Sequence, residues 1–570
     1  MINKWIVADS LDMKEVERIS KILKLPAPII KILFTRNLKN EKEISEFLNP
    51  SIDKLHDPFL MSGMAQTAER IVKAIDSNEK IMIFGDYDAD GITSTAMLYK
   101  FLHALGSSPI YFIPNRVEDG YGLSLSGIDF ATMNKVDLII TVDCGITAFQ
   151  EIEYAKTKGI DVVITDHHEV MNSIPPAVAV INPNRENETY PFKFLAGCGV
   201  VFKLIQAIAT MKKYEGDVIE DFIDFVTLGT VADVVPLLGE NRVISHYGMK
   251  HIVKTSNPGI KKLIEVSGVD KNKITAFHIG FILAPRINAM GRMSNATNAV
   301  KLLITDNERT AEDIANELDS KNRMRQEVDQ DVFEEAVGMI ENQNLQLNSV
   351  IILAKENWHE GVIGIVASRI VEKYNKPTIM ISISEGIGKG SGRSIPSFHL
   401  YDALKSVEGM LISFGGHRLA AGITIKKENI EVFKQAIQRL AIQTSNGESE
   451  IRKIDIDCEI SLDDIDYELE KMIDLLSPFG FMNSKPVFLS KRLSIVGYPS
   501  LLKEKHLRIC LKENTKTFES IWFNNGKDLL KDIAMPNKRF DVAYHITKNE
   551  YAGRNVIQLQ IIDMKVSDDA

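Results

Sequence analysis

The chain has 570 residues, of which 45% are apolar, and a formal net charge of -10. Its length predicts three or four domains of about 150 residues each, and its apolar content is high enough to fill their cores. The negative net charge excludes a protein that coats a polyanion through bulk positive charge. Any site for a polyanion must therefore be a local basic surface.

The sequence carries no signal for secretion or for a membrane span. No apolar run approaches the roughly 20 residues that cross a bilayer, and the N-terminal segment lacks the apolar core of a signal peptide. The four cysteines are scattered and do not have the spacing of a zinc site or of a disulfide framework. We expect a cytoplasmic protein that has reduced thiols and does not bind membranes.

The first part of the chain predicts a parallel α/β domain. Residues 1–45 are expected to form a small helical lead-in, and the domain is expected to occupy residues 46–300. Within it, short apolar runs alternate with helical stretches, and these runs are 81–85, 110–113, 136–142, 161–165 and 177–181. Continuous apolar runs of this kind are typical of a parallel sheet covered by helices on both faces.

The remaining residues predict three further units. A charged segment over 301–346, with sparse apolar positions at helical spacing, predicts a long connecting helix. A second α/β pattern follows over 347–445, and alternating short strands over 451–570 predict a small β-barrel. The predicted fold is therefore α/β, with two parallel-sheet lobes joined by a long helix and a C-terminal barrel.

Four clusters of carboxylates and imidazoles follow apolar runs of the first lobe. They are the DYDAD segment at 86–90, Asp143, the DHH segment at 166–168, and Asp233. Carboxyl ends of parallel strands share one edge of the sheet, where ligands bind. Mixed carboxylate and imidazole ligands favour Mn²⁺ or Mg²⁺, and two ions about 3.5–4 Å apart suit in-line attack on phosphorus. The sequence predicts a two-metal site for phosphoryl transfer.

The first cluster also has a predicted local geometry. In an extended segment Asp88 and Asp90 point to the same side, and Gly91 permits a tight turn into a helix expected to begin at Ile92. A single Asp at a strand end is usually a cap or a turn former. Four such clusters in sequence favour the metal site over this plainer interpretation.

Six motifs of the chain occur together in one known superfamily. They are GDYDADGIT at 85–93, VDCGI at 142–146, TDHHE at 165–169, LGTVADVVPL at 228–237, RINAMGR at 286–292 and FGGHRLAAG at 414–422. On these motifs the chain resembles the DHH phosphoesterase superfamily and, within it, the RecJ family of single-strand-specific exonucleases. The resemblance implies a DHH catalytic domain, a DHHA1 lobe that closes over substrate, and an OB-fold barrel.

The resemblance also implies roles for individual residues. It implies two Mn²⁺ or Mg²⁺ ions, held by Asp88, Asp90, Asp143, His167 and Asp233. The catalytic residues implied are Asp143, His167 and His168, with His168 near the scissile phosphate. Asp86 lies outside the shared pair of aspartates, and its ligation of a metal is left open. Phe84 occupies a position where the superfamily often has a ligand histidine.

Other residues of the first lobe are predicted to hold the substrate. Arg286, Asn288 and Arg292 lie in a basic segment that is expected to be rich in turns and to contact phosphates. Arg116 and Tyr121 match RecJ-like sequences, with phosphate binding expected for the arginine and base stacking for the tyrosine. The sequence therefore places several strand contacts outside the metal clusters.

Two glycine clusters predict an anion site in the second lobe. Small residues let backbone amides approach an anion, and each cluster has a cation alongside. The candidate residues are Ser391, Arg393, Gly416 and His417. Both clusters also match the DHHA1-type lobe, whose resemblance implies contact with the substrate.

The implied activity is stepwise 5′-to-3′ hydrolysis of single-stranded DNA to 5′ mononucleotides, in DNA repair and recombination. A single-strand binding protein and a RecQ-type helicase are the candidate protein partners. Two alternatives stay open. One is a DHH-family phosphodiesterase for short oligonucleotides, which would not need a C-terminal barrel. The other is a non-catalytic replication scaffold, which would have lost its metal ligands.

Overall fold

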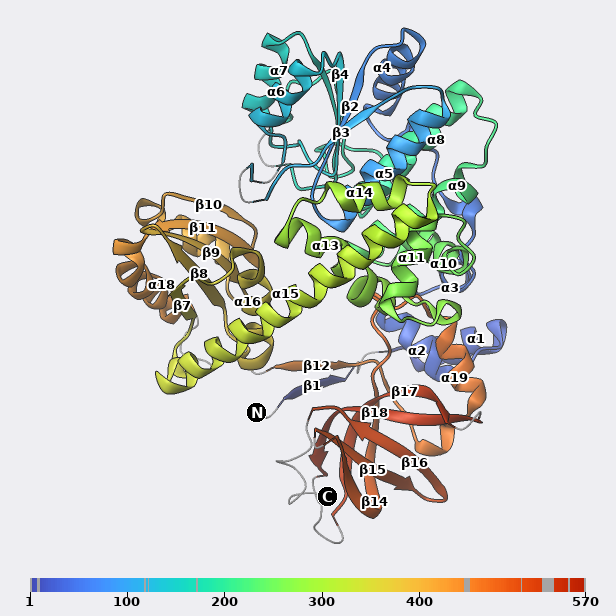
Figure 1. The fold of residues 1–570 in the computed structure, drawn as a ribbon. Coiled ribbons are helices and arrows are strands. Elements are labelled where there is room, and N and C mark those ends of the chain that lie inside the picture. The colour runs from blue at the N-terminus through green and yellow to red at the C-terminus, as the bar shows by residue number, and fades with distance from the viewer. Residues whose placement is uncertain are drawn as a thin grey trace.

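The computed structural model describes residues 3–7, 11–116, 119–120, 122–170, 173–444, 452–503, 505–524, 538–551 and 554–567. It has two α/β lobes joined by a long helix, with a barrel below them in the view of Figure 1. Tyr121 lies outside the described residues. Across the part of the chain that is described, none of the helices combines the length and the apolarity needed to cross a bilayer.

The first lobe is built on a five-stranded parallel sheet with the order β3-β2-β4-β5-β6. The strands are β2 (Ile81–Gly85), β3 (Ile110–Phe112), β4 (Leu138–Val142), β5 (Asp161–Thr165) and β6 (Ala179–Ile181). Every residue of β2 and β4 is buried. These runs are apolar throughout because helices cover both faces of the sheet.

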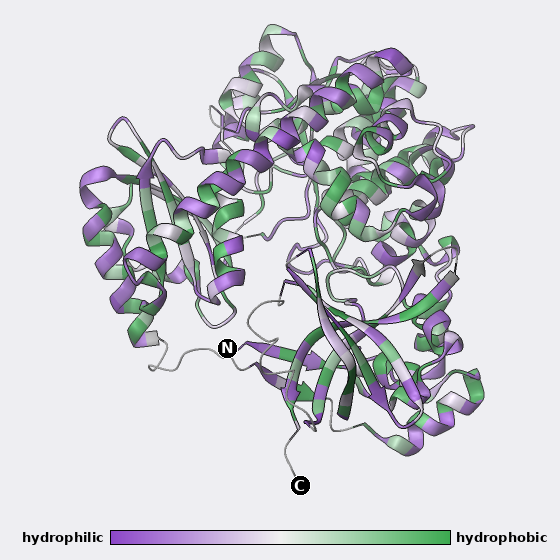
Figure 2. Cartoon of the chain, turned by 60° about the horizontal axis from the view of Figure 1, so that its bottom comes forward, coloured by the Kyte–Doolittle hydropathy of each residue, from purple (hydrophilic) through white to green (hydrophobic). Residues whose placement is uncertain are grey.

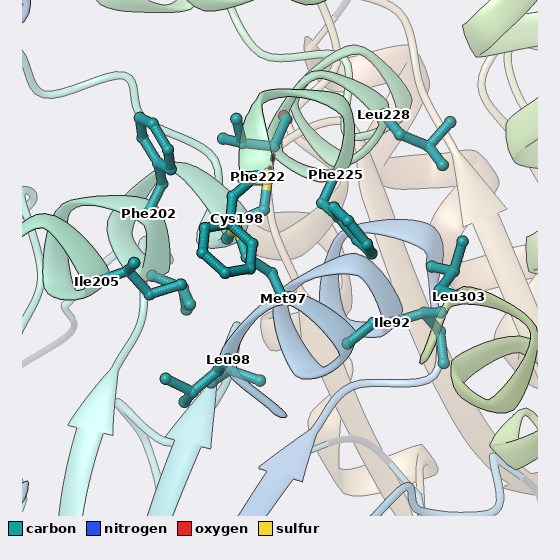
Figure 3. Close-up of a cluster of buried hydrophobic side chains, with 14 of the residues drawn as sticks. Ile92, Met97, Leu98, Cys198, Phe202, Ile205, Phe222, Phe225, Leu228 and Leu303 are labelled. Carbon is teal, nitrogen blue, oxygen red and sulfur yellow. Dashed lines mark hydrogen bonds between the residues drawn. The ribbon is translucent and has the colours of Figure 1, made fainter. Parts of the chain in front are cut away.

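Helices supply most of the first core. They are α4 (Met64–Asp76), α5 (Ala89–Ala104), α6 (Leu125–Met133), α7 (Phe149–Thr157), α8 (Gly197–Lys212), α9 (Val218–Ala232), α10 (Gly239–Ile252), α11 (Pro258–Ser267), α12 (Ala276–His278), the π-turn η4 (Ile279–Leu283), α13 (Ala284–Met293) and α14 (Thr297–Ile304). Side chains of α5, α8 and α9 interlock beside the sheet, as Met97, Phe202 and Phe225 illustrate in Figure 3.

The predicted connecting helix is α15 (Glu308–Asn342). Its 35 residues span about 52 Å at 1.5 Å per residue, and it runs from the first lobe to the second (Figure 1). Its first half contributes Ala315 and Leu318 to the core of the first lobe. Its second half contributes Val332 and Ala336 to a core in the second lobe. One helix is therefore packed into both lobes.

The second lobe has a mixed five-stranded sheet with the order β10-β11-β9-β8-β7. Its elements are β7 (Ile351–Glu356), α16 (Glu360–Tyr374), β8 (Thr378–Ser384), β9 (Ile387–Arg393), α17 (Leu400–Lys405), β10 (Ser413–Gly416), β11 (Ala420–Lys426) and α18 (Ile430–Thr444). Only β7 and β8 pair in parallel among these strands, and the other three pairs are antiparallel.

The predicted C-terminal barrel is confirmed. Its elements are β13 (Cys458–Glu459), α19 (Tyr467–Asp474), β14 (Phe488–Leu502), β15 (His506–Glu513), β16 (Lys516–Trp522), β17 (Phe540–Tyr551) and β18 (Arg554–Val566). Pairing of β14 with β17 closes the sheet. Buried and more exposed positions alternate along β15, and the barrel strands in Figure 2 mix hydrophobic and hydrophilic residues accordingly.

The N-terminal elements pack against this barrel. Strand β1 (Lys4–Val7) pairs in parallel with β12 (Lys453–Ile456), and the two lie side by side in Figure 1. The lead-in helices are α1 (Met13–Leu23), α2 (Ala27–Thr35) and α3 (Glu41–Leu48). Their apolar side chains, Ile19 and Ile30 among them, share one core with barrel residues such as Phe488 and Leu559. The two ends of the chain thus form one packed unit.

Candidate metal centre

The carboxyl edge of the first sheet gathers the predicted clusters. The DYDAD segment follows β2, Asp143 follows β4, and the DHH segment follows β5, and these three strands are neighbours. Asp233 does not follow a strand of this sheet. It is the residue that caps the C-terminus of α9. Asp143 has a φ of 61°, a conformation uncommon outside glycine and found at functional sites.

The imidazole of His167 lies at the centre of these carboxylates. Its Nε2 is 3.2 Å from Asp143 Oδ1, 3.6 Å from Asp233 Oδ2 and 3.9 Å from Asp90 Oδ2. This nitrogen is buried and has no hydrogen-bond partner among the residues that the structure describes. The lone pair of a neutral imidazole nitrogen and three carboxylates repel one another. A cation between them would remove this repulsion.

A second group of ligand atoms adjoins the first. Oxygens of Asp86, Asp88 and Asp143 lie within 4.8 Å of one another. Asp143 belongs to this trio and also to a trio with His167 and His168. A carboxylate shared in this way suits a pair of neighbouring ions. Asp86, which the sequence left open, is therefore a candidate ligand by position.

Helix α5 begins earlier than the sequence predicted. It starts at Ala89, and Asp88 caps it by accepting hydrogen bonds from the backbone of Asp90 and Gly91, at 3.0 Å each. The expected start at Ile92 is wrong because the aspartate is itself a strong N-cap residue. Asp90 consequently lies in the first helical turn instead of on an extended strand.

Asp90 is held by a contact that the sequence did not reveal. The backbone N–H groups of Gly197 and Cys198, at the start of α8, donate to its two carboxylate oxygens at 2.6 and 2.8 Å. The N-terminus of a helix favours a carboxylate through its free N–H groups and its dipole. The sequence signal was available only as the small-residue run AGCG at 196–199.

Asp166 organises the histidine pair. It accepts hydrogen bonds from the backbone of His167 (2.7 Å) and Ile146 (2.9 Å), and its Oδ1 lies 2.7 Å from Nδ1 of His168. Asn184 and Asn182 donate to the carbonyl oxygens of the two histidines, at 2.6 and 2.9 Å. Asp166 thus ties the loop after β5 to the loop after β4. The sequence analysis named Asp166 only as part of the DHH cluster, and it predicted no role for Asn182 or Asn184.

Burial and mutual repulsion shape the titration of this site. Burial raises the pKa of Asp143 and of Asp233 well above the ordinary value, and neighbouring carboxylates raise both further. Burial disfavours the His168 imidazolium, but the hydrogen bond to Asp166 raises the pKa of His168 to about 9. Burial and the neighbouring His168 lower the pKa of His167, which keeps it neutral as a metal ligand must be.

Arginines adjoin the acidic cluster. The guanidinium of Arg116 lies over the ring of Tyr87, 5.3 Å from its centroid, and Tyr87 stands between Asp86 and Asp88 in the chain. Burial, together with repulsion from Arg116, Arg325 and Arg393, lowers the pKa of Arg292 to about 10. Such mutual repulsion marks a concentration of positive charge, which fits a polyanion. The sequence did not single out Arg325.

The RINAMGR segment is helix α13 and not the turn-rich loop that was expected. Arg286 donates to the carbonyl of Ile282 at 2.6 Å and forms an ion pair with Asp319 at 2.9 Å. Asn288 Oδ1 accepts a hydrogen bond from the backbone of Ala89 at 2.7 Å. Both polar groups support the fold around the site, and neither contact supports the expected phosphate role.

The second lobe brings its predicted residues toward the first. Arg292 donates to the carbonyl of Gly361, at the start of α16, across 2.9 Å. Arg393 donates to Ser391 Oγ at 3.1 Å, and both lie on β9.

Gly416 ends β10 with a φ of 137°, where an added Cβ would lie 2.4 Å from the carbonyl oxygen of Ala420. The following His417 reaches back to the first lobe, with its Nδ1 3.6 Å from Glu169. The predicted residues of the second lobe therefore adjoin the acidic edge of the first.

Family models match all three parts of the chain. The DHH family N-terminal domain matches residues 80–230, the DHHA1 domain matches 347–443, and the RecJ OB domain matches 456–563. The first match contains the DYDAD and DHH segments. The third coincides with the closed barrel.

Whole-chain comparisons agree with these matches. The single-stranded-DNA-specific exonuclease RecJ of Bacillus subtilis is 36% identical over 98% of this chain and 70% of its own length. The enzyme of the same name from Escherichia coli is 34% identical over 97% and 98%. The crystal structure of RecJ in complex with Mn²⁺ from Thermus thermophilus matches with a TM-score of 0.85 and 27% identity, over 100% of this chain and 80% of that one. The chain belongs to the RecJ family.

Proposed function

We propose that the chain is a metal-dependent exonuclease specific for single-stranded DNA, which works from the 5′ end and releases 5′ mononucleotides. One observation carries the proposal: His167 Nε2 is buried among Asp90, Asp143 and Asp233, within 3.9 Å of each, without a hydrogen-bond partner in the described part of the chain. The substrate is inferred from the names of the relatives, single-stranded-DNA-specific exonucleases, and the 5′-to-3′ direction is inferred from the family resemblance.

The donor set fits Mn²⁺ or Mg²⁺, because it combines hard carboxylates with one neutral imidazole. Asp88, Asp90, Asp143, His167 and Asp233 would hold the ions, as the family resemblance implies. When bound, two such ions lower the pKa of a water and offset negative charge on the phosphate. The backbone N–H groups that hold Asp90 and the cap at Asp88 fix these carboxylates before any ion arrives.

His168 would act on the substrate instead of on the metal. Its Nδ1 lies 2.7 Å from Asp166, and this hydrogen bond raises the pKa of His168 to about 9, which favours the protonated ring. A protonated ring can donate from Nε2 to a phosphate oxygen and stabilise the charge that develops there. The catalytic residues of the proposal are therefore Asp143, His167 and His168.

The arginine cluster would hold the end of the strand beside the metal centre. Arg116 and Arg292 come from the first lobe and Arg393 from the second, so a phosphate between them would be gripped by both lobes. Ser391, Gly416 and His417, the other residues predicted in the second lobe, would add contacts to the strand. A strand end fixed at one side of the metal centre is hydrolysed one nucleotide at a time.

The domain boundaries predicted from the sequence are part of the proposal. Residues 46–300 would hydrolyse the strand, 347–445 would close over it, 451–570 would guide it, and 301–346 would connect the lobes. DNA repair and recombination in the cytoplasm would be the setting, which the unpaired state of all four cysteines supports. A RecQ-type helicase and a single-strand binding protein would supply unpaired DNA.

The test is Mn²⁺-dependent digestion of single-stranded DNA labelled at either the 5′ or the 3′ end, with Asp143→Ala as the inactive control. We expect the 5′ label to appear at once as a mononucleotide, while the 3′ label stays in long strands until late. Hydrolysis of dinucleotides alone would refute the proposal in favour of a small-substrate phosphodiesterase. Binding without any hydrolysis would favour a scaffold.

A further inference from the structure

An unusual apolar feature lies outside the metal centre and the arginine cluster. Phe277 and Phe281 are 61% and 73% exposed. Their rings stack on each other with centroids 5.1 Å apart and planes 26° apart. Two phenyl rings left in water lose the free energy that burial of aromatic area normally supplies. An exposed pair of this kind therefore suggests that a ligand covers the rings.

The backbone that presents the rings is also unusual. Phe281 lies on η4, a π-turn between α12 and α13. Single π-turns are rare, and they are found frequently at functional sites. Arg286 fixes this turn by donating to the carbonyl of Ile282, the residue after Phe281, at 2.6 Å. This contact of Arg286 thus holds the segment of the aromatic pair in place.

The segment that carries the pair packs against α9, the helix that Asp233 caps. An atom added as Cβ at Gly280, between the two rings in the chain, would lie 3.7 Å from the carbonyl oxygen of Val231. Val231 lies in the last turn of α9, and Asp233 caps that helix. Val234 follows, with a φ of 59° and a side chain 63% exposed. The segment that carries the rings therefore packs against the helix end that supplies a metal ligand.

The positive charge near the rings suits the phosphate backbone of a DNA strand. Arg286 and Arg323 share the single carboxylate of Asp319, at 2.9 and 2.6 Å, which leaves one net positive charge at this place. The Arg323 side chain is 71% exposed. Stacked aromatic rings beside a cation are the usual means of holding unpaired bases without reading their sequence.

We propose that Phe277 and Phe281 form a stacking platform for unpaired bases of the DNA strand as it approaches the metal centre. The proposal rests on the proposed function, since it names a further contact for the same substrate. The occupant is a nucleobase because its flat π-face matches the exposed face of a phenyl ring and its phosphate matches the adjacent cation. A duplex keeps its bases stacked on one another, so the platform would also favour single strands.

The experiment measures binding of a fluorescent single strand to the full chain in EDTA, so that no hydrolysis occurs. We expect the double variant Phe277→Ala, Phe281→Ala to raise Kd about tenfold or more, because base stacking on aromatic side chains is lost. Met133→Ala is the matched control. Met133 is 75% exposed at the end of α6, and it comes before the amino end of β4, whereas the metal ligands follow the carboxyl ends of the strands. The control should bind as the wild type does.

Binding of DNA that lacks single bases is a second measurement, and on the wild-type chain it does not require a stable variant. Abasic sites are introduced at successive positions along the strand, and wild-type binding should weaken at one or two neighbouring positions. Removal of the base at those positions should not weaken binding by the double alanine variant. Loss of the base and loss of the rings would then be coupled in a thermodynamic cycle, as expected for groups in contact. The pair Phe277→Leu, Phe281→Leu keeps apolar side chains without flat rings, and it should behave as the alanine pair does.

The results separate the platform from the proposed function. Wild-type digestion of single strands together with unchanged DNA binding by the alanine pair would overturn the platform alone, and would assign the apolar rings to a protein partner. Normal binding by the leucine pair would overturn stacking as the mechanism. Failure of the wild-type chain to bind or digest single strands would overturn the proposed function itself.

Discussion

The substitution Gly197→Ala is predicted to disable the metal centre without unfolding the protein. Gly197 is the first residue of α8, and its N–H donates to Asp90. A Cβ at this position would lie 2.4 Å from Asp143 Oδ1 and 2.6 Å from Asp143 Cβ. The glycine is therefore needed because two metal-site carboxylates approach its backbone closely.

The size of the effect follows from this overlap. Ordinary van der Waals contact begins at 3.4 Å, so the new methyl group would push the carboxylate of Asp143 away by about 1 Å. Misplacement of a catalytic group by that distance lowers rates by about 100-fold, which is about 2.7 kcal/mol of transition-state stabilisation. Alanine is favoured over glycine in a helix by roughly 0.5–1 kcal/mol, which offsets part of the strain in the folded state.

Gly199→Ala is the matched control, two residues further along the same helix. Its Cβ would meet only the flexible side chain of Leu195, at 3.1 Å. We expect kcat/KM for a single strand with Mn²⁺ to fall about 100-fold in Gly197→Ala and to change little in Gly199→Ala, with similar thermal unfolding of both. Equal activity of the two variants would refute a catalytic position for Asp143 beside Gly197.

Three further predictions concern the metal, the substrate and the pH dependence of stability. Asp143→Ala should abolish turnover and remove the increase in Tm that Mn²⁺ produces in the wild type. Arg393→Ala should raise Kd for a single strand about tenfold. It should also reduce the slope of log Kd against log salt concentration by about one. Burial opposes the charged form of His251, but Asp224 and Glu220 raise its pKa. His251→Gln should therefore lower Tm most below pH about 6.5, with the difference fading as pH rises through the raised pKa.

Each of these results has a contrary outcome. A normal Mn²⁺-dependent shift of Tm in Asp143→Ala would remove that carboxylate from the ligand set. An unchanged Kd and salt slope in Arg393→Ala would place this arginine outside the substrate site. A Tm difference for His251→Gln that grows toward alkaline pH would contradict the ion pairs at 2.7 and 2.9 Å as the source of its stabilisation.

The sequence revealed most of the metal centre because all its ligands except Asp233 follow strands that are largely apolar. Such strands can be recognised locally, and parallel pairing then brings their ends together. Some of the hydrogen bonds that hold the ligands come from residues distant in the chain, such as the bond from Gly197 to Asp90, which lie 107 positions apart. No local pattern announces contacts of that kind, so the support of the ligands was not predicted.

Helix α13 shows a different reason for error. Its sequence contains Pro285, Asn288 and Gly291, which are poor helix formers and favoured the prediction of turns. Tertiary packing reverses that preference: a Cβ at Gly291 would lie 2.7 Å from the carbonyl of Tyr87, so only glycine allows the helix to approach the DYDAD segment. The ion pair of Arg286 with a residue on α15 was equally invisible before the fold was known.

The shared core of the first helices and the barrel has a consequence for biosynthesis. Leu48 ends α3 and Cys458 begins β13, so more than 400 residues separate the two halves of that core. A ribosome adding about 5–20 residues per second would take roughly 20–80 s to reach the second half after it has made the first. During that interval the apolar faces of the earliest helices have no native partner. These faces stay exposed, or make temporary contacts, until the barrel residues of the same core are made.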